Sequence, residues 1–234
     1  MKEIIAQLEA AGDPDDAVAL ARYFKTGPGE YGEGDRFAGI RVPALRQIVK
    51  PYGRQPFVEA DWLPLLQHPV HEYRLAALLA MTYRFPRSPA EEQRRIYRCY
   101  LDNTAMINNW DLVDLSCRTV VGGYLLDRDR RPLDQLAESA SLWERRIAII
   151  STHEFLPLKQ SADTYRIALT LINDDQDLIH KAVGWSLREA GKRVSEAELL
   201  EFLDRHAPEL PRTALRYAIE RLDPAQRQRY LRMR

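Results

Sequence analysis

Residue types that could do chemistry stand out first in the segment Asn108–Asp114. Trp110 and Asp114 lie four residues apart, so they share one face if the segment is helical. A carboxylate beside an aromatic plane can stabilise a developing positive charge or orient a water molecule, and the indole offers a flat wall to a sugar or a cation. The structural alternative is that Trp110 belongs to the core and Asp114 pairs with a neighbouring arginine.

Two later segments place basic side chains at helical spacing from tryptophans. Arg146 follows one tryptophan by three residues and is a candidate partner for a phosphate or a carboxylate. Lys181, Trp185 and Arg188 fall on one helical stripe, and basic groups beside an aromatic ring suit a nucleic-acid backbone and its sugars. Gly184 costs this helix about 1 kcal/mol relative to alanine, which indicates close packing or access for a ligand. The plain alternative for the basic residues is a solvated charged face.

The sequence lacks the usual motifs of zinc enzymes, serine hydrolases and cofactor-binding proteins. The five histidines lack HxxxH or HExxH spacing, there is no GxSxG segment, and no cofactor motif occurs, so we expect neither a metal nor a cofactor. The glycine-rich segment 27–39 has no Gly-Lys-Ser/Thr ending and follows no strand, so a phosphate-binding loop is not expected. It is interpreted as a long turn with several glycines at positive φ.

The elements that must position these residues are helices throughout. A continuous apolar pattern over 73–85 predicts a buried helix, and no alternating pattern predicts a strand. Asp13, Ser88 and Asp223 stand at helix starts, where a short acceptor side chain can cap free N–H groups. The other predicted helices cover 2–11, 14–25, 43–52, 56–67, 90–102, 110–126, 131–139, 141–155, 160–173, 176–190, 195–205, 209–221 and 224–232.

Faint internal similarity indicates a repeat. The triplet that begins at Arg74 (Arg-Leu-Ala) is echoed at Arg146 (Arg-Ile-Ala) and at Arg212 (Arg-Thr-Ala), with separations of 72 and 66 residues. Trp110 lies halfway between the first two. A unit of about 36 residues with two helices resembles HEAT and armadillo repeats, which stack into a continuous core and leave one concave face for a ligand.

Bulk properties set the outer limits of the interpretation. The chain has 234 residues, of which 45% are hydrophobic, and this is enough for one domain covering 1–234. A net charge of zero counts mildly against nucleic-acid binding, although charge on one face matters more than the sum. Two cysteines form no disulfide framework, the N-terminus lacks the apolar core of a signal peptide, and no window predicts a membrane span, so we expect a cytoplasmic protein.

Several segments, in order and spacing, resemble the AlkD-like DNA alkylation repair family. The strongest match is Lys181–Glu189 (KAVGWSLRE), followed by Trp110–Asp114 (WDLVD) and Trp143–Ala148 (WERRIA). Weaker matches lie at 21–25, 37–43 and 212–216, so the resemblance covers nearly the whole chain.

The resemblance implies an all-α superhelical solenoid of HEAT-like repeats whose basic concave face binds duplex DNA. Family members excise N3- and N7-alkylated purines, which are positively charged, and leave the lesion stacked in the duplex. The implied roles are Asp114 as the catalytic carboxylate, Trp110 and Trp185 as rings against the sugar, Arg146 as a phosphate contact, and Tyr23 as a residue near the lesion. Lys181 and Arg188 join the expected DNA contacts, and a monomer is expected.

Two other functions fit the same scaffold. The first is a non-catalytic protein that binds DNA structures, and the second is a protein-binding HEAT-like adaptor. The joint presence of Trp110, Asp114, Arg146 and Trp185 favours the enzyme, since an adaptor needs no such set. The acidic residues of segment 27–39 are a departure from the family pattern, and the role of this segment is not indicated by the sequence.

Overall fold

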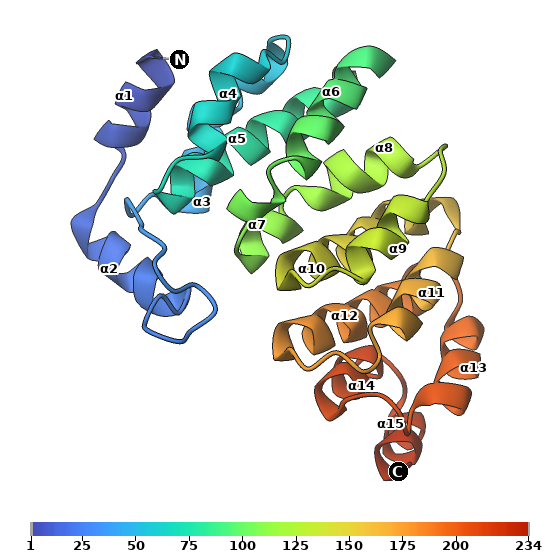
Figure 1. Ribbon diagram of the computed structural model, residues 1–234. Coiled ribbons are helices and arrows are strands. Elements are labelled where there is room, and N and C mark those ends of the chain that lie inside the picture. Colours follow the sequence, from blue (N-terminus) through green and yellow to red (C-terminus); the bar gives the residue numbers. More distant parts are fainter. Residues whose placement is uncertain (1, 234) are drawn as a thin grey trace. The chain divides into compact units, whose positions relative to one another are not determined.

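A computed structural model describes residues 2–233, and within that range all regular secondary structure is helical (Figure 1). Arg36 and Val70 form an isolated β-bridge. The all-α class predicted from the sequence is confirmed. Contacts within the chain gather in two compact units, residues 1–120 and 121–234, and each unit is described by itself. The single domain expected over 1–234 stays a prediction.

The first unit contains seven α-helices in the described range, joined by short 3₁₀ turns. They are α1 (Lys2–Ala10), α2 (Pro14–Tyr23), α3 (Val42–Val49), α4 (Glu59–Leu66), α5 (His71–Arg84), α6 (Ala90–Leu101) and α7 (Trp110–Asp114). Helices α3, α5 and α7 pack side by side as one layer, and α4 and α6 form a second layer against them (Figure 1). Helix α5 is central, and all its residues from His71 to Met81 are buried.

The second unit repeats this two-layer arrangement. Its helices are α8 (Gly123–Leu125), α9 (Arg131–Ala137), α10 (Leu142–Ser151), α11 (Ala162–Thr170), α12 (Asp177–Arg193), α13 (Glu196–His206), α14 (Arg212–Ala218) and α15 (Pro224–Arg232). Helices α10, α12 and α14 form one layer, and α9, α11 and α13 pack against it (Figure 1). Each layer buries the apolar face of the other, as in helical repeat proteins.

Hydrogen bonds between successive repeats confirm the period read from the sequence. Gln67 Nε2 donates to Asn103 Oδ1 across 36 residues, and Thr213 Oγ1 donates to Asp177 Oδ1 across another 36. The same position in consecutive repeats is therefore about 36 residues further along the chain. Each repeat packs against the next one along the chain, and this stacking builds the core of each unit.

The helix predicted over 110–126 is interrupted. Helix α7 ends at Asp114, and a π-helical turn covers Arg118–Gly122. The Ser116 hydroxyl bonds the carbonyls of Leu112 and Val113, which competes with the helical hydrogen bonds one turn later. The continuous helix expected from the apolar pattern is therefore wrong in this segment.

Two of the three predicted N-caps are confirmed. Asp13 accepts from the N–H groups of the first turn of α2, and Asp223 does the same for α15. Ser88 is not a cap, because Pro89 occupies the N-cap position of α6 and the Ser88 hydroxyl donates to the carbonyl of Arg84 instead.

Gly184 is explained by close packing rather than by access. A Cβ atom at this position would lie 2.3 Å from the carbonyl oxygen of Ala214 and 2.5 Å from Cβ of Tyr217. Only glycine therefore allows α12 and α14 to approach this closely. Among residues 2–233, no helix is both long enough and apolar enough to cross a membrane.

Candidate active site

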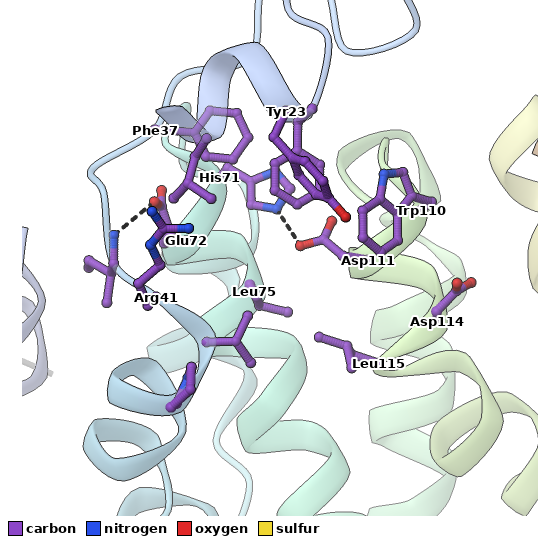
Figure 2. A pocket seen from close by; sticks show the side chains of 15 residues that line it. Tyr23, Phe37, Arg41, His71, Glu72, Leu75, Trp110, Asp111, Asp114 and Leu115 are labelled. Atoms are coloured by element: carbon purple, nitrogen blue, oxygen red, sulfur yellow. Dashed lines mark hydrogen bonds and ion pairs between the residues drawn. The ribbon is translucent and has the colours of Figure 1, made fainter. Parts of the chain in front are cut away.

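The short helix α7 presents two of the predicted site residues from one face. Asn109 caps it by accepting a hydrogen bond from the N–H of Trp110 at 2.8 Å. Trp110 and Asp114 both line a pocket in the first unit, and Tyr23 reaches the same pocket from the end of α2 (Figure 2). Three residues named from the sequence therefore meet at one place, although Tyr23 lies 87 residues before Trp110 and 91 before Asp114.

The pocket has a volume of about 440 Å³ and a mostly apolar lining. Arg41 and Glu72 lie on one side of it, and the carboxylate of Asp114 lies on the other side with Trp110 (Figure 2). Helices α2, α3, α5 and α7 and the end of segment 27–39 enclose it. The lining residues are Leu20, Tyr23, Phe24, Phe37, Ile40, Arg41, Val42, Pro43, His71, Glu72, Leu75, Trp110, Asp111, Asp114 and Leu115.

Aromatic contacts hold the indole of Trp110 in place. The ring of Phe24 stacks on Trp110 with centroids 5.1 Å apart, and Tyr23 meets Trp110 edge-on at 5.9 Å. Phe24 is 6% exposed, whereas Tyr23 is 64% exposed. Phe24 is thus a buried support for Trp110, and Tyr23 is a ring available to a ligand at the rim of the pocket.

Beneath this aromatic wall lies a buried group of four charged residues, which we call the His71 cluster: His71, Asp35, Arg74 and Asp111. His71 Nδ1 bonds Asp35 Oδ2 and His71 Nε2 bonds Asp111 Oδ2, both at 2.9 Å. Arg74 Nη2 donates to Asp35 Oδ1 at 2.6 Å. The four side chains are only 2–6% exposed. Two positive and two negative groups therefore neutralise one another inside the first unit.

Both acceptors of His71 are carboxylates, so each ring nitrogen must carry a proton to bond them. Burial by itself would lower the pKa of His71, but the hydrogen bonds to Asp111 and Asp35 outweigh it and raise the pKa to about 9. Burial pushes the pKa of Asp35 upward, while its bonds to His71 and Arg74 bring the net pKa below the ordinary value. The cluster is thus a charged imidazolium between carboxylates at neutral pH.

The glycine-rich segment 27–39 is fastened to the first turn of α5. The carboxylate of Glu72 accepts from the backbone N–H groups of Ala38, Gly39 and Ile40 at 2.9, 2.9 and 3.1 Å. Gly29, Gly34 and Gly39 have φ between 75° and 83°, which confirms the predicted turn with glycines at positive φ.

In the second unit, Trp185 and Arg146 lie on adjacent helices of one layer. Trp185, on α12, meets the ring of His153 edge-on with centroids 4.8 Å apart, and His153 Nε2 bonds the Ser186 hydroxyl at 2.8 Å. Arg146, on α10, is 5% exposed and donates from Nη1 to the carbonyl of Leu178 at 2.6 Å. In this structure Arg146 therefore joins α10 to the start of α12, and its predicted phosphate contact stays a prediction.

Lys181 and Arg188 share α12 with Trp185, and both form ion pairs. Lys181 Nζ lies 2.8 Å from Asp177 Oδ2, one turn earlier on the same helix, and its side chain is 42% exposed. Arg188 pairs with Glu220, and its side chain is 18% exposed. Lys181 is therefore the more accessible of the two predicted DNA contacts, and Arg188 would have to leave Glu220 to meet a phosphate.

Sequence reasoning missed the His71 cluster and Phe24. A signal did exist, because Asp35, His71 and Asp111 are separated by 36 and 40 residues, close to one repeat each. Residues one repeat apart face each other in stacked repeats. A titratable residue that recurs at the repeat period is therefore a candidate member of a network between helices.

Comparison with known proteins assigns the family. The family described as DNA alkylation repair enzyme matches residues 4–222, so the chain belongs to this family. No curated protein matches the sequence significantly. A solved structure described as "Predicted DNA alkylation repair enzyme from Enterococcus faecalis" has a TM-score of 0.71 at 19% sequence identity, over 91% of this chain and 97% of that chain. At this identity the likeness concerns the fold, and it agrees with the helical repeat architecture.

Membership in the family supports a role in the repair of alkylated DNA, with DNA as the substrate. The family resemblance predicted from Trp110–Asp114, Trp143–Ala148 and Lys181–Glu189 is thereby confirmed.

Proposed function

We propose that this protein is a DNA glycosylase that removes N3- and N7-alkylated purines from duplex DNA. The observation that supports this most directly is the joint position of Trp110, Asp114 and Tyr23 on one pocket of the first unit (Figure 2). A carboxylate next to an indole face suits a sugar that develops positive charge. Family membership independently supports alkylated DNA as the target.

The proposed chemistry needs little from the protein beyond positioning and charge. An alkylated purine already carries a positive charge, so it can leave without being protonated. The bond between C1′ and the purine nitrogen breaks, its electron pair departs with the base, and the base becomes neutral. The sugar then resembles an oxocarbenium ion, which the carboxylate of Asp114 and the ring of Trp110 stabilise. Water adds to C1′ and releases a proton.

We propose the basic residues of the second unit as DNA contacts. The Lys181 side chain is 42% exposed, and Trp185 on the same helix is partly exposed. Phosphate contacts would fix the position of the duplex without reading its sequence. This agrees with a target defined by its alkylation rather than by its neighbours.

The test is release of 7-methylguanine and 3-methyladenine from methylated duplex DNA by the wild type and by Asp114→Asn. We expect the wild type to release both bases and Asp114→Asn to be slower by about 100-fold or more, because the variant loses a charge that acts in the transition state. Duplex affinity should stay within about twofold, since no phosphate contact is removed.

Asp102→Asn is the matched control, because it neutralises an exposed carboxylate at the end of α6 outside the pocket. This variant should release both bases at the wild-type rate. If the wild type released neither base but bound duplex DNA in a salt-sensitive way, the protein would be a non-catalytic DNA binder. If it bound no DNA at all, the adaptor function would remain.

A further inference from the structure

A buried histidine connects the glycine-rich segment 27–39 with helix α7. Asp35 belongs to the segment, Asp111 belongs to α7, and His71 at the start of α5 bonds both carboxylates at 2.9 Å. Figure 2 shows His71 directed toward Asp111, the residue that follows Trp110 in the chain. A bond to Asp111 therefore acts one residue away from the indole and one helical turn away from Asp114.

A second bond runs parallel to the first. Arg74 Nη2 donates both to Asp35 Oδ1 at 2.6 Å and to Asn108 Oδ1 at 3.0 Å, just before α7 begins. Helix α7 has only five residues, so its own hydrogen bonds hold it weakly. The orientation of α7 must then depend on contacts with the neighbouring elements. His71 of α5 supplies such a contact at Asp111, and Arg74 supplies one at Asn108.

The same histidine supports the aromatic wall of the pocket. The ring of His71 lies 4.6 Å from Phe37 and 5.1 Å from Phe24, and Phe24 stacks on Trp110. A charged imidazole ring attracts the faces of both phenyl rings. The contacts thus lead from the segment through His71 and Phe24 to the indole.

We propose that His71 is a positioning residue that joins the glycine-rich segment to α7 and thereby fixes Trp110 and Asp114 for the reaction, acting through Asp35 and Asp111 without touching the substrate. The effect of His71 on the reaction rate rests on the proposed glycosylase function. The structural link between segment 27–39 and α7 does not. It gives segment 27–39 a role, which is to bring Asp35 to the buried imidazolium. The charged groups that face His71 are Asp35 from the segment, Asp111 from α7 and, through Asp35, Arg74 from its own helix.

The first measurement needs no DNA. Nitrogen-15 NMR of the imidazole groups in the full-length wild type should show one histidine with both ring nitrogens protonated at pH 8, because two carboxylates accept from it. The assignment to His71 is made from loss of that signal in His71→Gln. A His71 that has lost a ring proton at pH 8 would overturn the proposal.

The second measurement uses Asp35→Asn, which keeps the shape of the side chain and removes its charge. Its matched control is Glu33→Gln, an exposed carboxylate of the same segment that bonds the N–H of Gly29 and not the cluster. We expect Asp35→Asn to lower the pH at which His71 loses its proton and to shift the indole N–H resonance of Trp110. Glu33→Gln should change neither. An unmoved Trp110 resonance in a folded Asp35→Asn protein would refute the connection.

The kinetic measurement is the single-turnover rate of 7-methylguanine release at saturating duplex DNA, at pH 6 and pH 8. With one carboxylate removed, His71 should still be charged at pH 6 but largely neutral at pH 8. Asp35→Asn should then be within about threefold of the wild type at pH 6 and at least about tenfold slower at pH 8, which is roughly 1.4 kcal/mol in the barrier. If Asp35→Asn only disturbed the structure, the ratio of its rate to the wild-type rate would be the same at both pH values. That result would count against the proposal.

The outcomes separate this inference from the proposed function. If the wild type released no alkylated base, the glycosylase function would fail, and the two NMR measurements would still decide whether His71 positions α7. If the wild type were active and Asp35→Asn matched it at both pH values, the glycosylase function would stand and the positioning role would be lost.

Discussion

Raising the pH should remove a large contribution of His71 to the stability of the first unit. The pKa of His71 is about 9 in the folded protein, against 6.5 for an ordinary histidine. A folded-state pKa that is raised means that the folded protein binds the proton more tightly than the unfolded chain does. The stabilisation is therefore complete below pH 6.5 and is lost as the pH rises toward 9.

The size of the effect follows from this difference in pKa. A rise from 6.5 to about 9 corresponds to roughly 3 kcal/mol of unfolding free energy, at 1.36 kcal/mol for each pH unit. Most of it should disappear between pH 7 and pH 9.5. Solvent does not screen these interactions appreciably, because the His71 side chain is 2% exposed. For a protein of ordinary stability this is a substantial fraction of the total.

The assay is urea unfolding followed by far-ultraviolet circular dichroism at several pH values, for the wild type and His71→Gln. Glutamine does not titrate, so subtracting its curve removes the contributions of all other groups. The quantity of interest is the unfolding free energy of the wild type minus that of His71→Gln. We expect this difference to fall by roughly 2–3 kcal/mol between pH 7 and pH 9.5. Curves that stay parallel over this range would show that His71 is not held as a buried cation.

Two further predictions concern α12. Gly184→Ala should destabilise the protein by roughly 1–2 kcal/mol, because overlap of the new Cβ with the carbonyl of Ala214 at 2.3 Å outweighs the gain in helix propensity. In the same helix, the Cβ of Gly191→Ala would meet the Leu199 side chain, with Cδ2 at 2.5 Å and Cβ at 3.0 Å, whereas Gly184→Ala also meets backbone, so Gly191→Ala should destabilise the protein less. Equal melting temperatures for the two variants would contradict the packing argument. Lys181→Gln should weaken binding to all duplex sequences and reduce the slope of log K against log salt by about 1, whereas an effect confined to one sequence would exclude a phosphate contact.

The sequence by itself determined the helical class, the repeat and part of the site. Apolar periodicity depends only on residues close together in the chain, so the helices and the caps at Asp13 and Asp223 could be predicted locally. The four-residue spacing of Trp110 and Asp114 placed both on one face for the same reason. The interruption after α7 was missed because the Ser116 hydroxyl competes with backbone bonds in a way that hydrophobicity does not reveal.

Tertiary structure alone decided which distant residues support the site. Asp35 and Asp111 look like ordinary solvated carboxylates in the sequence, and only the stacking of repeats buries them on either side of His71. The same holds for Arg146, which local spacing marks as an exposed basic residue but which packing turns inward to the carbonyl of Leu178. Burial and charge pairing depend on neighbours that lie a whole repeat away, so no local pattern can reveal them.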